Sequence, residues 1–214
     1  MRPADLLLFD LDGTLVTSGG DICSSVNYTL KTLDLPIIDN DEIIRYIGDG
    51  VRRLIERSLG QGSQDRFEDA MRIFASHYEE HMLDTTELYP SMENVLTHFR
   101  NKRKVVVTNK RYYFAHKMLD AMNVSVHFEK IIGADSTPYI KPDARILFPV
   151  MENIDIRADR IVVIGDGVND IILAKNAGVV SCAFLNGLGR REDLLSFKPD
   201  YVYESPAELI TLFY

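Results

Sequence analysis

The chain of 214 residues carries 24 lysine and arginine residues against 32 aspartate and glutamate residues, so its formal net charge is −8. This acidic balance, without a long basic cluster, excludes a surface that binds nucleic acid by charge alone. Hydrophobic residues make up 46% and charged residues 26% of the chain, which is typical of a globular protein and excludes a disordered one.

The start of the chain and its cysteines suggest where the protein works. Acidic residues interrupt the apolar run at Leu6–Phe9 within a few positions, so this run predicts neither a secretion signal nor a membrane span. Cys23 and Cys182 lie far apart without the spacing of a metal site, which is typical of reduced thiols. We therefore expect a cytoplasmic protein with no membrane partner.

Short apolar runs along the chain predict buried strands. Continuous rather than alternating hydrophobicity is what strands covered on both faces require. From about residue 91, amphipathic helical patterns separate these runs, and Pro149 predicts a break in one of the helices. Alternating strands and helices predict an α/β fold with a doubly wound parallel sheet, similar to a Rossmann fold. The predicted strands are Leu6–Phe9, Val105–Thr108, Ile131–Gly133, Ile161–Ile164 and Val180–Leu185.

The segment 17–87 has a different pattern, with helical periodicity and no convincing strand. Phe67, Phe74 and Tyr78, for example, recur on one helical face. The simplest interpretation is an α-helical cap domain over 17–87, inserted into a Rossmann-like core domain formed by 1–16 and 88–214. Residues 17–20 and 87–90 are the expected hinges.

Acidic residues follow two of the predicted strands. Asp10 and Asp12 come directly after the first strand, on the same side of an extended segment, and Asp166 follows the fourth. Ligands of a parallel sheet bind beyond the carboxyl ends of its strands. A cluster of carboxylates with no nearby histidine or cysteine suits Mg²⁺, the cofactor that we expect.

Groups of the opposite polarity follow two other strands. Thr108 and Asn109 offer a hydroxyl, an amide and backbone N–H groups, and Lys141 offers an ammonium. Asp170 begins the helix that follows Asp166. A magnesium ion, a lysine and hydrogen-bond donors around carboxylates are typical of phosphoryl transfer, where catalysis is mainly positioning and charge neutralisation.

Four motifs in this order, DLDGTL, VVTNK, IKPD and GDGVND, resemble those of the haloacid dehalogenase-like phosphohydrolase superfamily, and the match covers the whole sheet domain. The segment IGDGV in the insert and the run GDGVNDIILAKNAG are similar to the phosphoglycolate phosphatase branch. The resemblance implies a magnesium-dependent hydrolase of a small phosphorylated metabolite.

The resemblance also implies a role for each matching residue. Asp10 is the expected nucleophile, which forms an aspartyl-phosphate. Asp12 is the expected general acid and base, and an aspartate at this position favours a phosphatase or phosphomutase over a dehalogenase. Lys141 neutralises charge, and Thr108 and Asn109 bind the phosphoryl group. The expected metal ligands are Asp10, the backbone carbonyl of Asp12 and Asp166, with Asp170 as an orienting residue.

A substrate with a carboxylate besides its phosphate needs a cation from the cap. Arg52 and Arg53, after the Gly-Asp-Gly turn, are the candidates, although two charged residues in this place are more often a solvated helix face. Other small-molecule phosphatases, for sugar phosphates, nucleotides or pyrophosphate, stay open, as does a phosphomutase. The sequence leaves open whether the protein is a monomer or a homodimer.

Two alternatives of other classes remain. A binding module without enzymatic activity would normally have lost one of the acids, all of which are present here. The run His77–His81 matches the HxxEH pattern of inverted zinc proteases, but no third ligand is apparent and the same helix has an ordinary apolar face.

Overall fold

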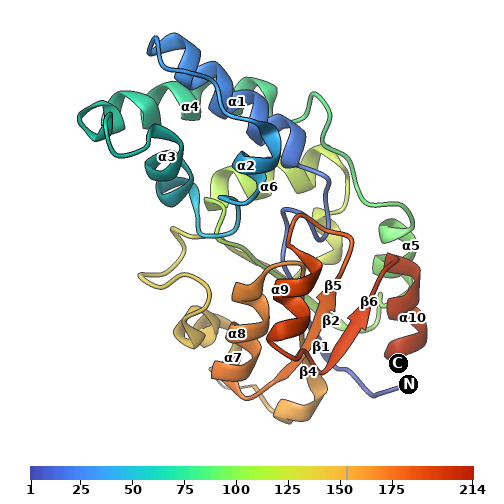
Figure 1. The fold of residues 1–214 in the computed structure, drawn as a ribbon. Coiled ribbons are helices and arrows are strands. Elements are labelled where there is room, and N and C mark those ends of the chain that lie inside the picture. The colour runs from blue at the N-terminus through green and yellow to red at the C-terminus, as the bar shows by residue number, and fades with distance from the viewer. Residues whose placement is uncertain (153) are drawn as a thin grey trace.

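The computed structural model describes residues 1–152 and 154–214. Its centre is a sheet of six parallel strands in the order β3-β2-β1-β4-β5-β6, with helices on both faces (Figure 1). The expected doubly wound parallel sheet is confirmed. The strands are β1 (Leu6–Phe9), β2 (Arg103–Val107), β3 (Lys130–Ile132), β4 (Ile161–Gly165), β5 (Val180–Phe184) and β6 (Tyr201–Tyr203).

Alternate side chains of β1 point into two separate hydrophobic clusters. Leu7 and Phe9 belong to a cluster that includes side chains of α5, α6 and α10, and Leu6 and Leu8 to one that includes side chains of α7 and α8. All four leucine and phenylalanine side chains are fully buried. The continuous apolar run of the strand follows from this cover on both faces. The helices are α5 (Met92–His98), α6 (Tyr112–Ala121), α7 (Phe148–Met151), α8 (Val168–Ala177), α9 (Arg191–Ser196) and α10 (Leu209–Leu212).

Two local features differ in how well the sequence predicts them. The expected break at Pro149 is confirmed, because a 3₁₀ turn over Ala144–Leu147 and the short helix α7 replace one continuous helix. Strand β6 was not expected. It has only three residues at the edge of the sheet, and Val202 is exposed while Tyr203 is buried, so it lacks the continuous apolar run of the inner strands.

The four helices that directly follow β1 in the chain sit beyond one end of the sheet in Figure 1. They are α1 (Gly19–Thr32), α2 (Asn40–Ile44), α3 (Val51–Leu59) and α4 (Phe67–His81). Ile22 and Val26 of α1 and Phe74 and Tyr78 of α4 are buried in the same cluster as Phe9 of the sheet. The helical bundle and the sheet therefore share one hydrophobic core. None of the described helices is long and apolar enough to cross a membrane.

Candidate active site

The chain leaves β1 at the centre of the sheet and carries Asp10 and Asp12 beyond its carboxyl end. The Asp10 amide donates to the Ile164 carbonyl at 2.8 Å, which extends the contact between β1 and β4 by one residue. Gly13 then takes a φ of +81°, and a Cβ atom there would lie 2.2 Å from Asp166 Oδ2. Glycine is therefore needed at position 13, both for the turn and for the close approach of Asp166.

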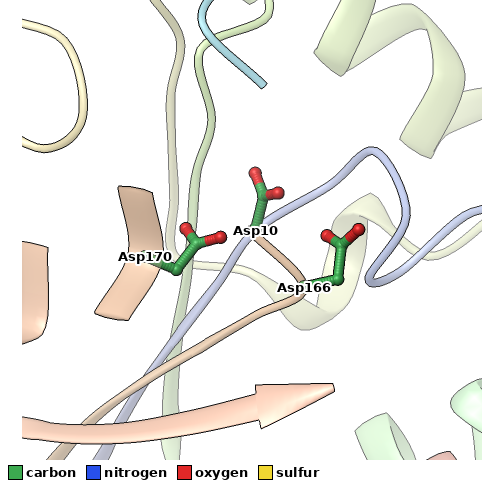
Figure 2. A group of neighbouring side chains, drawn as sticks. All are labelled: Asp10, Asp166 and Asp170. Atoms are coloured by element: carbon green, nitrogen blue, oxygen red, sulfur yellow. The ribbon is translucent and has the colours of Figure 1, made fainter. Parts of the chain in front are cut away.

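Three carboxylates from two segments of the chain meet beyond the ends of β1 and β4. Asp10, Asp166 and Asp170 each place an oxygen within 4.8 Å of the others, and Figure 2 shows the three side chains side by side. Asp166 follows β4 and accepts hydrogen bonds from Thr14 Oγ1 at 2.8 Å and from the Leu188 amide at 2.7 Å. These residues follow β1 and β4, and the order of the strands across the sheet reverses between these two strands. Ligands of such sheets usually bind at this point.

The electrostatics of these three aspartates favour a bound cation. Burial raises the pKa of Asp10 to about 8, although the Lys141 charge opposes the rise. Burial also raises the pKa of Asp166 to about 6, and the negative charge of Asp170 adds to the shift. Neighbouring buried carboxylates resist ionisation until positive charge joins them. Their oxygens are the ligands that a hard divalent cation prefers, so the cluster can hold a metal ion.

Lys141 connects two members of this cluster. Its ammonium donates to Asp10 Oδ1 at 2.6 Å and to Asp170 Oδ1 at 2.7 Å, and the lysine side chain is 3% exposed. Burial lowers the pKa of Lys141, but the two carboxylates outweigh burial and hold it above its usual value. An ammonium has three N–H groups, so one donor of Lys141 is left for a further ligand.

Asp12 turns away from the three aspartates toward a second lysine. Lys110 Nζ donates to Asp12 Oδ1 at 2.8 Å and to Oδ2 at 3.1 Å, and Ser18 Oγ donates to Oδ1 at 2.6 Å. Lys110 also donates to the Tyr78 hydroxyl at 2.7 Å. The motifs did not single out Lys110 as a site residue. Its place directly after Thr108 and Asn109 at a strand end is the signal that could have found it.

Thr108 and Asn109 follow β2 and behave differently. Thr108 is 1% exposed and lines a cavity of about 490 Å³ together with Asp10 and Lys141. The Asn109 amide is occupied by backbone groups: its Nδ2 donates to the carbonyls of Lys141 and Gly48, and its Oδ1 accepts from the Lys141 amide at 2.8 Å. Asn109 therefore braces the Lys141 backbone in this structure, whereas substrate binding was expected of it.

The structure does not bring the two expected cap arginines into the cavity. Arg52 lies 3.3 Å from Glu56 with its side chain 70% exposed, and its guanidinium stacks over the Phe67 ring. Arg53 also pairs with Glu56, at 2.8 Å, and lines a neighbouring hollow instead. The buried face of α3 carries Leu54, Ile55 and Leu59, so both arginines occupy the opposite face. The arginines that line the cavity are Arg45, Arg111 and Arg190.

The histidines of the protease-like pattern serve packing. The His77 ring stacks on Tyr28 and on His81, with centroids 3.9 and 4.2 Å away, and its Nδ1 lies 3.0 Å from Ser25 Oγ. His81 Nδ1 lies 2.8 Å from Asp84. Within the described residues, the aspartates near β1 form the only cluster of three metal-ligating side chains, so no zinc site accompanies the motif.

The geometry can be compared with known proteins. Residues 7–184 match the family model described as haloacid dehalogenase-like hydrolase. The chain belongs to the haloacid dehalogenase-like hydrolase family. A phosphoglycolate phosphatase of Colwellia psychrerythraea is 33% identical to this hydrolase, over 98% of the chain and 97% of the relative. One of Aquifex aeolicus is also 33% identical, over 97% of the chain and 95% of the relative.

The fold comparison agrees with the sequence comparison. The crystal structure of a predicted phosphoglycolate phosphatase from Haemophilus somnus 129pt matches this hydrolase with a TM-score of 0.91 and 27% identity, over 99% of both chains. Because phosphatases match almost the full length of the hydrolase in both sequence and structure, we conclude that it is a phosphatase.

Proposed function

We propose that this phosphatase hydrolyses a small phosphomonoester through an aspartyl-phosphate on Asp10. The observation that carries the proposal is the environment of Asp10. Its Oδ1 accepts from Lys141, its Oδ2 has no hydrogen-bond partner among residues 1–152 and 154–214, and its side chain is 12% exposed at the cavity. One oxygen is thus oriented and the other is available to attack phosphorus.

The chain can supply both steps of this hydrolysis. A carboxylate oxygen of Asp10 bonds to phosphorus as the bond to the substrate alcohol oxygen breaks, and Asp12 gives that oxygen a proton. Water then bonds to phosphorus, gives a proton to Asp12 and releases phosphate and Asp10. The third N–H group of Lys141 and the Thr108 hydroxyl are proposed to bind the phosphoryl oxygens.

A divalent cation fits the site. Asp10 and Asp166 are the proposed carboxylate ligands, with the backbone carbonyl of Asp12, and Asp170 stays paired with Lys141 at 2.7 Å. Burial raises the pKa values of Asp10 and Asp166, and a cation at the site offsets that cost of ionisation. Mg²⁺ bound there supplies positive charge that lets the phosphate approach the acidic cluster.

We further propose that residues 17–87 form a cap over the catalytic domain of residues 1–16 and 88–214. The turn at Gly48 and Asp49 supports this proposal, because it touches the sheet domain. Asn109 Nδ2 donates to the Gly48 carbonyl at 2.8 Å, and Asn169 Nδ2 donates to Asp49 Oδ1 at 2.8 Å. A cap docked in this way excludes bulk water from the reaction.

Phosphoglycolate is the proposed substrate, because relatives that match over nearly their full length bear its name. Its carboxylate needs a cation at the cavity wall. Arg45, at the end of α2, is the candidate in place of Arg52 and Arg53. Arg111 lies 3.5 Å from Asp135 and Arg190 lies 3.4 Å from Glu192, whereas Arg45 has no ion-pair partner within the described part of the chain.

A phosphate-release panel tests the substrate proposal. It contains phosphoglycolate, sugar phosphates, nucleotides, pyrophosphate and p-nitrophenyl phosphate, with a bisphosphorylated sugar as an activator to detect a phosphomutase. Phosphoglycolate is expected to give the highest kcat/KM. Arg45→Ala is expected to raise the KM for phosphoglycolate about tenfold, the effect of one lost charge-assisted hydrogen bond, and to leave the KM for p-nitrophenyl phosphate unchanged. The control variant Arg53→Ala is expected to keep the wild-type KM for both substrates. A higher kcat/KM for another metabolite contradicts the substrate proposal.

A further inference from the structure

Lys110 occupies an unusual position between the sheet and the helical bundle. It follows β2 on the segment that carries Thr108, and its side chain is 7% exposed. Its ammonium makes three hydrogen bonds, to Asp12 Oδ1 at 2.8 Å, to Asp12 Oδ2 at 3.1 Å and to the Tyr78 hydroxyl at 2.7 Å. The two partners lie on opposite sides of the boundary, since Asp12 follows β1 and Tyr78 belongs to α4.

The partners of the ammonium distinguish the two lysines of the site. Lys141 donates to Asp10 and Asp170, so it contacts the proposed nucleophile. Lys110 donates to the Asp12 carboxylate and the Tyr78 hydroxyl, so it contacts the proposed general acid and base. Although both lysines line the same cavity, each is paired with a different aspartate of the proposed reaction.

Tyr78 is held firmly enough to fix Lys110. Its side chain is 2% exposed, its ring stacks on Phe74 with centroids 5.4 Å apart, and Phe114 of α6 meets it edge to face at 5.4 Å. The hydroxyl therefore reaches Lys110 from a ring that is packed on two sides. A side chain whose rotamer is locked by packing is what a positioned catalytic group needs around it.

We propose that Lys110 is a positioning residue that holds the Asp12 carboxylate in place for proton transfer, and that Tyr78 holds Lys110 there when α4 is docked against the sheet. This inference rests on the proposed function, in which Asp12 protonates the leaving oxygen. Lys110 then acts on the reaction through Asp12, without touching the substrate.

The leaving group provides a readout that a merely structural role does not move. An alkyl phosphate releases a strongly basic alkoxide and needs the proton from Asp12, whereas p-nitrophenyl phosphate releases a weakly basic phenolate and does not. The value of kcat/KM reports the steps up to the departure of the alcohol. Disturbing Asp12 therefore lowers kcat/KM for the alkyl substrate much more than for the aryl substrate.

The experiment measures kcat/KM of the full-length, magnesium-loaded enzyme for the best alkyl phosphate of the panel and for p-nitrophenyl phosphate. Lys110→Met keeps the aliphatic stem and removes the ammonium. Lys117→Met is the matched control, because Lys117 of α6 also donates to α4, to the Glu79 carbonyl at 3.0 Å, but touches no site residue. Tyr78→Phe keeps the packed ring, and Tyr113→Phe, which removes a hydrogen bond to Glu79, is its control.

We expect Lys110→Met to lower the alkyl to aryl ratio of kcat/KM at least about tenfold, which is part of the roughly 10²–10⁴-fold that general acid catalysis contributes, because Asp12 itself stays in place. Tyr78→Phe, which serves if Lys110→Met does not fold, is expected to lower the ratio about threefold, and neither control is expected to change it. An unchanged ratio in Tyr78→Phe and in a folded Lys110→Met overturns the inference; an equal loss on both substrates in Lys110→Met indicates direct phosphate binding and also overturns it. Asp12→Asn tests the proposed function separately. If Asp12 is not the general acid, kcat/KM of this variant falls no more for the alkyl substrate than for the aryl one.

Discussion

The ammonium of Lys141 lies 2.6 Å from Oδ1 of Asp10, although the two residues are 131 positions apart in the chain. The same ammonium lies 2.7 Å from Asp170 Oδ1. One buried lysine thus serves two buried carboxylates, one of which is the proposed nucleophile. This arrangement orients Asp10 and offsets part of the repulsion within the acidic cluster.

Lys141→Met leaves Asp10 and Asp170 without their cation. Removing one partner of a buried ion pair typically costs about 3–5 kcal/mol, so we expect the free energy of unfolding, measured by urea denaturation in EDTA, to fall by about that amount. Turnover is expected to fall at least about a hundredfold, as after the loss of one preorganised electrostatic contact. Lys117→Met, at a side chain that is 41% exposed, is the control. Wild-type turnover in Lys141→Met contradicts its assigned role.

Gly165→Ala is expected to impair the site by displacing Asp170. A Cβ atom at position 165 would lie 2.1 Å from Asp170 Cγ, so the carboxylate has to leave its place beside Lys141. We expect kcat/KM to fall at least about tenfold, equivalent to roughly 1.4 kcal/mol. Gly62→Ala, where a Cβ atom meets nothing within 4 Å, is expected to leave kcat/KM unchanged. Equal kcat/KM values for the two variants contradict this prediction.

The contacts of Asp21 are expected to make one junction of the protein sensitive to acid, the one between α1 and residues 85–86, which follow α4. It is 2% exposed and accepts hydrogen bonds from the amides and hydroxyls of Thr85 and Thr86, at 2.6–3.1 Å. Burial raises the pKa of Asp21, but these hydrogen bonds outweigh burial and hold it below the usual 3.8. Stabilisation by a carboxylate with a depressed pKa is complete above the pKa of the unfolded chain and is lost as the pH falls through the folded value.

The comparison of wild type with Asp21→Asn tests this sign. At neutral pH the variant is expected to be less stable by about 2 kcal/mol, the value of a hydrogen bond to a charged group. The difference in the free energy of unfolding is expected to stay constant down to about pH 5 and to shrink below about pH 4, the ordinary range of an aspartate. A difference that grows toward acid contradicts the assigned direction of the pKa.

Removal of the metal is expected to abolish turnover. EDTA should stop phosphate release, and Mg²⁺ should restore it and raise the thermal midpoint, since a ligand at a hundred times its Kd adds about 2.7 kcal/mol of stability. In Asp166→Asn, Mg²⁺ is expected to raise the thermal midpoint less than it does in wild type, whatever the midpoint of the variant without metal. The control Asp65→Asn, at an exposed side chain, is expected to show the wild-type rise. Full activity in EDTA contradicts the metal proposal.

The sequence predicts those parts of the protein whose signals are local. Strand β4 is a continuous apolar run, and Asp166 directly after it is visible as a polar residue at a strand end. The contact of Lys110 with Tyr78 depends on how α4 packs against the sheet, which no local pattern reports. The placement of Arg52 depends on which face α3 turns to the core. Strand β6 is too short and too exposed to stand out.

The most direct test of the account is to detect the phosphoryl group on Asp10. Wild type and Asp12→Asn, mixed with substrate and quenched in acid, are expected to carry one phosphoryl group on Asp10 by peptide mass spectrometry, with more in Asp12→Asn because its hydrolysis is slow. Asp10→Asn is expected to keep the fold, as judged by circular dichroism, and to show neither adduct nor turnover. Turnover in Asp10→Asn, or a phosphoryl group on another residue, contradicts the account.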